Sequence, residues 1–294
     1  MNPRERGFLL LTSHLGDPER KVLTVAQLRT LAIRVRDMQP LESDRELTER
    51  DLAALGYSRE AAGHIVSLFN QEDLLDGYLA RGAAMGCVPI TRVSDRYPQI
   101  LRQRLGLDSP GCLWARGDVE ILNTPAISLV GCRELSEPNR EFAETVGHQA
   151  AEQGLTLVSG NARGADRTAQ DACLKVGGRV ISIVADSLNR FPPRNMLYLS
   201  EDGFDEEFSA QRALSRNRCI HALGRMVFVA QCDLHKGGTW SGTVKNLRFG
   251  WSPVACFRDG SEAASQLEQM GAYQVGLADL QDFACLQTPD NFLW

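Results

Sequence analysis

The spacing of apolar residues changes along the chain, and the first region has a helical period. Apolar residues recur there three and four positions apart, which is the pattern of one buried helix face. The clearest series is Val25, Leu28, Leu31, Ala32 and Val35. Thr48 followed by Asp51 resembles a capping box, which marks a helix start. We therefore expect residues 1–72 to form a small helical module.

After Pro125 the pattern alternates between short apolar runs and helix-length amphipathic segments. The runs predict strands at Ala126–Val130, Thr156–Ser159, Arg179–Val184, Met226–Val229 and Pro253–Phe257. The segments between and after them predict helices at Asn139–Gln153, Asp166–Val176, Ala210–Leu223, Thr239–Phe249 and Glu262–Met270. Continuous apolar strands separated by helices indicate a mostly parallel sheet covered on both faces. We expect an α/β domain over 73–294, with its core sheet at about 125–260 and a short helical C-terminal end. The acidic stretch Asp202–Glu207 is expected to be a solvated loop.

Three glycine-containing turns are predicted to join a strand to a helix. They are Gly131–Ser136, Ser159–Asp166 and Gly237–Thr239. Such turns leave backbone N–H groups unpaired at the positive end of a helix, and this favours phosphate. Because ligands of parallel sheets bind beyond the carboxyl ends of the strands, we expect the three turns to share one edge. The first two match neither G-x-G-x-x-G nor G-x-x-x-x-G-K-[ST], so they do not support a dinucleotide or ATPase site.

Composition limits the class of protein without naming a function. The 294 residues are 43% hydrophobic and 23% charged, as in ordinary globular proteins. The net charge of −5 argues against coating of duplex DNA by bulk attraction, although a local basic face is compatible with it. No apolar run approaches the length of a membrane span, and the N-terminus lacks a signal-peptide pattern. We therefore expect a cytoplasmic protein without membrane association.

The cysteines and histidines do not suggest a metal or cofactor. The eight cysteines form no C-x-x-C pair, and most lie in apolar segments, so we expect buried reduced thiols. The five histidines lack the spacing of metal ligands. Neither a metal site nor a bound cofactor is predicted.

Several charged residues have two possible roles. Arg163 lies among glycines, where it either binds phosphate oxygens or pairs with Asp166. Asp166 at a helix start is more typical of a cap than of a catalytic acid. For Arg133, a phosphate contact and a structural ion pair are equally compatible with the sequence.

The later segments carry similar alternatives. Arg216 and Arg218 flank Asn217, which suits a nucleic acid backbone, although the same residues can serve the fold itself. Lys245 either extends a basic face or is solvated. Trp240 either stacks on a base or fills core space.

Three ordered motifs together resemble the DprA/Smf DNA-processing family. The family patterns V-G-S-R-x-x-S, V-S-G-x-A-x-G-I-D and R-N-R-I-I are similar to Val130–Ser136, Val158–Asp166 and Arg216–Ile220. Upstream, Tyr97–Leu101 and Leu113–Asp118 resemble two further family segments. The resemblance extends from about Leu47 to Phe257.

The resemblance implies an extended Rossmann-like domain preceded by a helical module of the sterile-alpha-motif kind. It also implies single-stranded DNA binding, a homodimer, and RecA loading or protection of incoming DNA in recombination and natural transformation, with a RecA-type recombinase as partner. The predicted nucleic acid or phosphate site consists of Gly131, Arg133, Ser136, Ser159, Gly160, Arg163, Gly164, Asp166, Arg216, Asn217, Arg218, Gly237, Gly238, Thr239 and Lys245.

The chain also departs from the family pattern. Cys132, Ala165 and Gln170 replace the usual Ser, Ile and His, and 236–242 replaces the usual S-G-S-L-x-T-A segment. After about Gln287 we expect no winged-helix domain. Phosphoribohydrolases of the same wider fold group carry a catalytic Glu where this chain has Asn246, so we expect no enzyme activity.

Two alternative functions remain open at this point. The departures and the negative net charge are compatible with an antitoxin-like or regulatory subunit of an antiphage defence pair, whose partner would be a cognate toxin. A nucleotide sensor or phosphoribohydrolase-like protein is the other alternative. The sequence does not decide whether DNA or a free nucleotide occupies the site.

Overall fold

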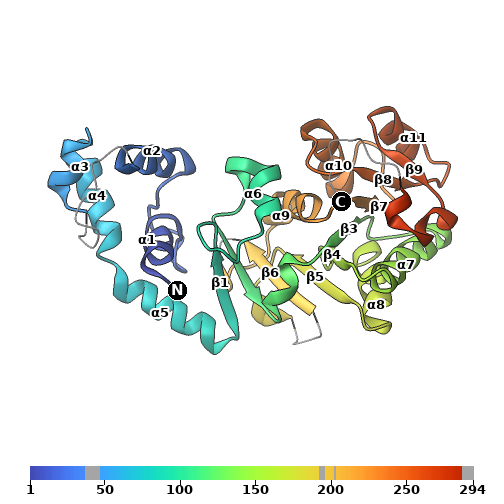
Figure 1. Ribbon diagram of the computed structural model, residues 1–294, viewed down its shortest axis with the longest axis horizontal. Coiled ribbons are helices and arrows are strands. Elements are labelled where there is room, and N and C mark those ends of the chain that lie inside the picture. The colour runs from blue at the N-terminus through green and yellow to red at the C-terminus, as the bar shows by residue number, and fades with distance from the viewer. Residues whose placement is uncertain (37–46, 192–195, 202, 287–294) are drawn as a thin grey trace.

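The computed structural model describes residues 1–36, 47–191, 196–201 and 203–286, which form an elongated molecule with a helical end and a sheet-containing end (Figure 1). The helices are α1 (Pro3–Thr12), α2 (Val25–Arg36), α3 (Glu49–Ala54), α4 (Arg59–Phe69), α5 (Glu72–Ala84), α6 (Gln99–Leu105), α7 (Glu137–Glu152), α8 (Ala165–Lys175), α9 (Ala210–Leu223), α10 (Gly237–Phe249) and α11 (Glu262–Gln269). The strands are β1 (Cys87–Thr91), β2 (Cys112–Arg116), β3 (Ala126–Val130), β4 (Thr156–Ser159), β5 (Arg179–Val184), β6 (Met196–Glu201), β7 (Val227–Val229), β8 (Val254–Phe257) and β9 (Tyr273–Val275).

One sheet runs through the larger end of the molecule, in the order β1-β2-β6-β5-β4-β3-β7-β8-β9. The strands from β6 to β9 in this order are parallel, and β2 and β1 continue the sheet in antiparallel pairing. The chain leaves β3 toward β4 but leaves the neighbouring β7 toward β8. This reversal makes the carboxyl ends of β3 and β7 the place where such a sheet opens a crevice.

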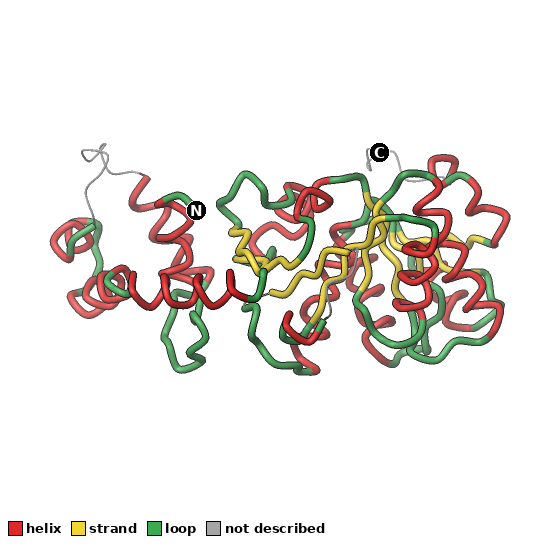
Figure 2. Tube along the Cα trace, turned by 90° about the horizontal axis from the view of Figure 1, so that it is seen from below, coloured by secondary structure: helices red, strands yellow, loops and turns green. Residues whose placement is uncertain are grey.

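Alternate side chains of the central strands enter two different cores. In β3, Ile127 and Leu129 pack with Phe142 of α7, whereas Ala126 and Val130 pack on the side of α9 and α10. All five residues of β3 are buried, as expected for a strand with helices on both faces. Figure 2 shows the strands between helices. The predicted α/β class with a mostly parallel sheet is confirmed.

The N-terminal helices form a third, smaller core of their own. Leu31 of α2, Leu52 of α3 and Ile65 of α4 belong to it. The Thr48 hydroxyl accepts a hydrogen bond from the Asp51 N–H, and the Asp51 carboxylate accepts one from the Thr48 N–H, which is the predicted capping box. Residues 1–72 therefore contain the predicted helices, although Leu9 of α1 packs into the larger core. Their independence as a domain remains a prediction.

The predicted strands and helices of the second region match the structure with shifts of at most two residues at their ends, but β6 and β9 were not predicted.

The interpretation of Asp202–Glu207 as a solvated loop was wrong for its centre. Phe204 is fully buried and packs on Trp114, with 4.8 Å between ring centroids. The Tyr78 hydroxyl donates to Asp205 Oδ1 at 2.7 Å. Asp202 itself lies outside the described residues. Through Tyr78 of α5 and Trp114 of β2, this segment contacts both α5 and the sheet.

Two further features of the described residues concern the cysteines and the longer helices. None of the eight cysteines, all of which lie within the described residues, forms a disulfide, and Cys285 is exposed. Across the described ranges, no helix combines the length and apolarity needed to span a membrane.

A glycine sets the close packing of α7 on α8, the two helices that begin beside the glycine turns. A Cβ on Gly147 would lie 2.1 Å from the carbonyl oxygen of Ala169, so the helices would have to separate. We expect Gly147→Ala to lower the free energy of unfolding by about 1–3 kcal/mol, measured by urea denaturation. The matched control is Gly77→Ala, which meets open space within α5 and should stabilise by about 0.5–1 kcal/mol. Equal effects of the two substitutions would contradict this packing argument.

Candidate functional site

A cavity of about 920 Å³ opens at the carboxyl ends of β3 and β7, between the first turn of α10 and one face of α9. It is therefore located where the strand order reverses. The predicted site residues that line it are Gly131, Arg133, Arg163, Asp166, Arg216, Asn217, Gly237, Gly238 and Thr239. The three glycine turns thus share one site, as their position at strand ends predicts.

Two glycines allow the first two turns to touch. A Cβ on Gly131 would lie 2.4 Å from the Cβ of Ala165, at the start of α8. Gly164 has φ +88°, and a Cβ there would lie 2.4 Å from the carbonyl oxygen of Cys132. The Ala165 N–H donates to that same carbonyl at 3.1 Å. These contacts need residues without side chains, so the glycines shape the wall of the cavity.

The third turn ends in a helix start that faces the cavity. Gly237 has φ +76°, and the residue before it, Lys236, makes no side-chain cap to α10. The Asn217 amide donates to the Gly238 carbonyl at 3.2 Å, and the Thr239 hydroxyl donates to the Gly131 carbonyl at 2.9 Å. Because the first N–H groups of a helix have no acceptor within it, this end of α10 offers donors to an anion.

A buried arginine joins the α9 side of the cavity to the turn after β4. Arg216 is 9% exposed, and its Nη2 donates to the Gly160 carbonyl at 3.1 Å. A Cβ on Gly160 would lie 1.7 Å from Arg216 Nη1, so the guanidinium occupies the space above this glycine. Burial lowers the pKa of Arg216, and the nearby Asp166 and Glu201 carboxylates counteract that effect.

Asp166 is the acidic counterpart of Arg216 in this wall. Burial raises the pKa of Asp166, and the Arg216 charge and a hydrogen bond from the Ala162 N–H at 3.1 Å oppose the increase. The expectation that Asp166 caps the helix was wrong, because the N-cap of α8 is Gly164. The carboxylate instead accepts from the turn before the helix. Because the Asp166 carboxylate is buried, lies near Arg216 and accepts from the Ala162 N–H, it stabilises the fold of this wall.

The remaining cations at the cavity differ in how far they are neutralised. Arg163 forms an ion pair with Glu134 at 2.6 Å, so the expected alternative partner, Asp166, is not the one it uses. Both side chains of that pair are largely exposed, and such pairs contribute little stability. Arg133 and Lys236 are exposed and have no side-chain partner within the described part of the chain. They are the cations most available to a ligand.

Several predicted site residues do not line the cavity. The Ser159 side chain is buried, and its hydroxyl donates to the Leu129 carbonyl at 2.9 Å. Ser136 is the N-cap residue of α7 and lines a neighbouring depression. Gly160 and Gly164 act through backbone shape. Lys245 is exposed on α10, two turns from its start.

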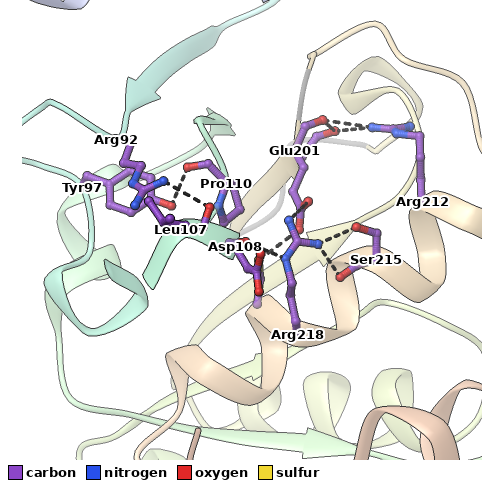
Figure 3. Close-up of polar contacts among 11 residues, drawn as sticks. Arg92, Tyr97, Leu107, Asp108, Pro110, Glu201, Arg212, Ser215 and Arg218 are labelled. Atoms are coloured by element: carbon purple, nitrogen blue, oxygen red, sulfur yellow. Dashed lines mark hydrogen bonds and ion pairs between the residues drawn. The ribbon is translucent and has the colours of Figure 1, made fainter. Parts of the chain in front are cut away.

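Arg218 of α9 does not line the cavity, and Figure 3 shows its guanidinium among Asp108, Glu201 and Ser215. Its Nε donates to the Asp108 carbonyl at 2.9 Å, and its Nη2 pairs with Glu201 at 2.9 Å. Its Nη1 donates to the Ser215 carbonyl at 2.7 Å. These contacts engage the guanidinium within the fold, and the phosphate contact of Arg218 stays a prediction. It attaches α9 to the end of β6.

Trp240 belongs to the core on the α9 and α10 side, where it is 8% exposed. Its ring stands edge-on to His235, with 5.0 Å between centroids. Of the two expected roles, the structure favours core filling.

No cluster of metal-ligating side chains occurs among the residues for which positions are described.

The residues that line the cavity but do not belong to the predicted site include Lys236, Phe208, Leu214 and His221. Lys236 precedes α10, and the exposed Phe208 and Leu214 stand near the start of α9. His221 lies one turn beyond Asn217 on the same helix. The helical spacing of 210, 213, 217 and 221 is the signal that could have indicated this face.

His221 is the most unusual group of the four. It is fully buried, and neither ring nitrogen has a hydrogen-bond partner in the described structure. Burial lowers the pKa of His221 to about 3, so the imidazole is neutral at physiological pH. A Cβ on Gly242 would lie 3.0 Å from its Nε2, which shows how closely α10 covers the ring.

This histidine makes stability sensitive to acid. Below the ordinary pKa of 6.5, the unfolded chain binds a proton on His221 that the folded chain binds only near pH 3. Stability should therefore fall as pH decreases from 6.5 to 3, by up to about 1.4 kcal/mol per pH unit. We expect His221→Leu to remove this component and to add about 1 kcal/mol at pH 7, since two unpaired nitrogens are lost.

Urea denaturation at several pH values measures the effect as the difference between the variant and the unmodified protein. His14→Leu, which removes an exposed imidazole, is the control and should keep the original profile. Parallel profiles for His221→Leu and the unmodified protein would contradict a neutral buried ring.

Comparisons with known proteins agree with the resemblance in the motifs. The family model described as DNA recombination-mediator protein A matches residues 89–283. DNA processing protein DprA of Streptococcus pneumoniae is 29% identical over 247 residues, covering 80% of each chain. Protein Smf of Escherichia coli is 30% identical over 152 residues, which cover 48% of this chain and 40% of that protein.

Two solved structures are similar over large parts of the chain. The X-ray structure of DprA from Streptococcus pneumoniae has a TM-score of 0.74 and 25% identity, covering 98% of this chain and all of that one. A structure of DprA from Helicobacter pylori, described by its single-stranded DNA binding mode, has a TM-score of 0.56 and 25% identity. It covers 67% of this chain and 93% of its own.

Proposed function

Since the chain belongs to the DNA recombination-mediator protein A family, we propose that it binds single-stranded DNA at the cavity between α9 and α10 and acts in DNA processing and recombination. The observation that carries the proposal is the start of α10, which has no side-chain cap and faces a cavity lined by Arg133 and Lys236, two cations without a side-chain partner among the described residues. The single-stranded DNA-binding relative supports it. Neither that relative nor the family match supports the antitoxin-like or nucleotide-sensing alternatives.

The charges at the cavity suit a few phosphates more than an extended duplex. Arg133, Arg163, Arg216 and Lys236 line it, and so do Glu134, Asp166 and Asp233. Arg163 lies beside Glu134, and Arg216 lies beside Asp166. The net positive field in the cavity is therefore weak. Backbone N–H groups must then supply much of the phosphate recognition, through short-range contacts that a flexible single strand reaches easily.

We further propose that the site binds without catalysing a reaction. Asn246 stands where the phosphoribohydrolases carry a catalytic Glu, and it is fully buried. Its amide donates to the Ser252 hydroxyl at 3.1 Å and accepts from the Ser252 N–H at 2.9 Å. These bonds hold the loop after α10, so the side chain is engaged in the fold. The homodimer and the RecA-type recombinase implied by the resemblance are part of the same proposal.

Substitution of the two unpartnered cations tests the site. We expect Arg133→Ala and Lys236→Ala each to weaken binding of a fluorescent oligo-dT by about tenfold at moderate salt, since each removes a charged phosphate contact. Each should also reduce the slope of log K against log salt by about 0.7, the value for one phosphate of a single strand. Fluorescence anisotropy across a salt series gives both quantities.

Lys245→Ala is the matched control, because it removes the same charge from α10 outside the cavity. It should change the affinity less than twofold. An equal loss in Lys245→Ala would indicate bulk attraction, and unchanged binding in the double variant Arg133→Ala, Lys236→Ala would rule out this cavity.

A further inference from the structure

A second depression lies beside the cavity, across the starts of α7 and α8. It has a volume of about 310 Å³ and shares Arg133, Glu134 and Arg163 with the cavity lining. Arg140 from the first turn of α7 and Arg167 from the first turn of α8 also line it. We call the four residues Arg133, Arg140, Arg163 and Arg167 the arginine shelf.

The shelf carries more positive charge than its neighbours neutralise. Four arginines line the depression, against the two carboxylates of Glu134 and Asp171. Arg167 is exposed, and its guanidinium has no partner among the described side chains. Arg140 Nε lies 3.7 Å from a Glu137 carboxylate oxygen, and these side chains are 45% and 89% exposed. An ion pair this long and this exposed leaves Arg140 available to another anion.

The fold itself brings these arginines together. α7 follows β3 and α8 follows β4, so both helices begin at the same edge of the sheet as the cavity. The close approach at Gly147 keeps the two helices side by side. Arg133 and Arg163 stand between the cavity and the outer depression, because they line both. A chain of phosphates leaving the cavity in this direction would pass Arg133 and Arg163, with Glu134 beside them, before it reaches Arg140 and Arg167.

We propose that the arginine shelf is a second phosphate site, on which the single strand continues after it leaves the cavity. This inference rests on the proposed function and adds the path of the strand. The cavity holds the first phosphates through backbone N–H groups, and the shelf holds later ones through arginine side chains. The polyanionic backbone of DNA is the occupant because the shelf is continuous with the cavity and its arginines are spread over two helices.

The test compares a short and a long oligo-dT, of about 4 and about 16 nucleotides, the range of site sizes for single-strand binders. We expect Arg140→Ala, Arg167→Ala to bind the long strand at least about tenfold more weakly and to lose about 1.4 from its salt slope, for two phosphates. The same double variant should bind the short strand within twofold of the unmodified protein. Arg140→Lys, Arg167→Lys keeps both charges and should retain most of the long-strand affinity.

The matched control is Arg4→Ala, Arg59→Ala, which removes two exposed arginines from the N-terminal helices. Equal weakening in this control would show that total charge, rather than the shelf, determines long-strand binding. Unchanged long-strand binding in the shelf variant, while Lys236→Ala weakens both strands, would overturn the shelf alone. Failure of the unmodified protein to bind either strand would instead overturn the proposed function.

Discussion

The contact between Arg216 and Gly160 joins two walls of the cavity, the α9 side and the turn after β4. The guanidinium enters from α9 and occupies the space that any side chain on Gly160 would need, while donating to its carbonyl. A buried cation is costly unless an opposite charge and hydrogen bonds surround it, and Asp166 at the start of α8 provides the charge. α9, the turn after β4 and α8 must therefore dock as one unit. Arg133 and Lys236 line the same cavity, and the contact between Arg216 and Gly160 helps to set the shape of its wall.

The sequence was most informative where one face of an element is fully apolar. β3, β4 and β5 were predicted to the residue, because all of their residues except the exposed Arg179 are buried and a turn follows each strand. β6 was not predicted because the described residues between it and β5 contain only the short 3-10 helix Leu188–Arg190, so the alternation of strand and α-helix that marked the other strands is missing there. β9 has only three residues, too few to show a period. The burial of Phe204 beside acidic neighbours depends on Tyr78 and Trp114, which are remote in sequence.

For the site, the sequence located the turns but not the directions of the side chains. The three glycine turns meet because parallel strands end at one edge, and this follows from topology alone. Arg216 and Arg218 are two residues apart on α9, and residues at that spacing do not share a helix face. Helical geometry therefore separates a pair that looks like one motif in the sequence. Lys245 lies eight residues after Gly237, about 12 Å along α10, and distance removes it from the cavity.

The negative net charge of the chain becomes understandable once the cations are placed. Long-range attraction to nucleic acid depends on the summed field, and a chain with net charge −5 provides little of it. Phosphate recognition at the start of α10 acts instead over one hydrogen-bond length, through N–H groups that carry no net charge. A stiff duplex presents its phosphates at fixed positions on a convex surface, whereas a single strand can bend into a cavity between two helices. The low overall charge and the concave, glycine-lined site therefore both disfavour the coating of duplex DNA. Short-range contact with a flexible single strand is left as the main source of affinity.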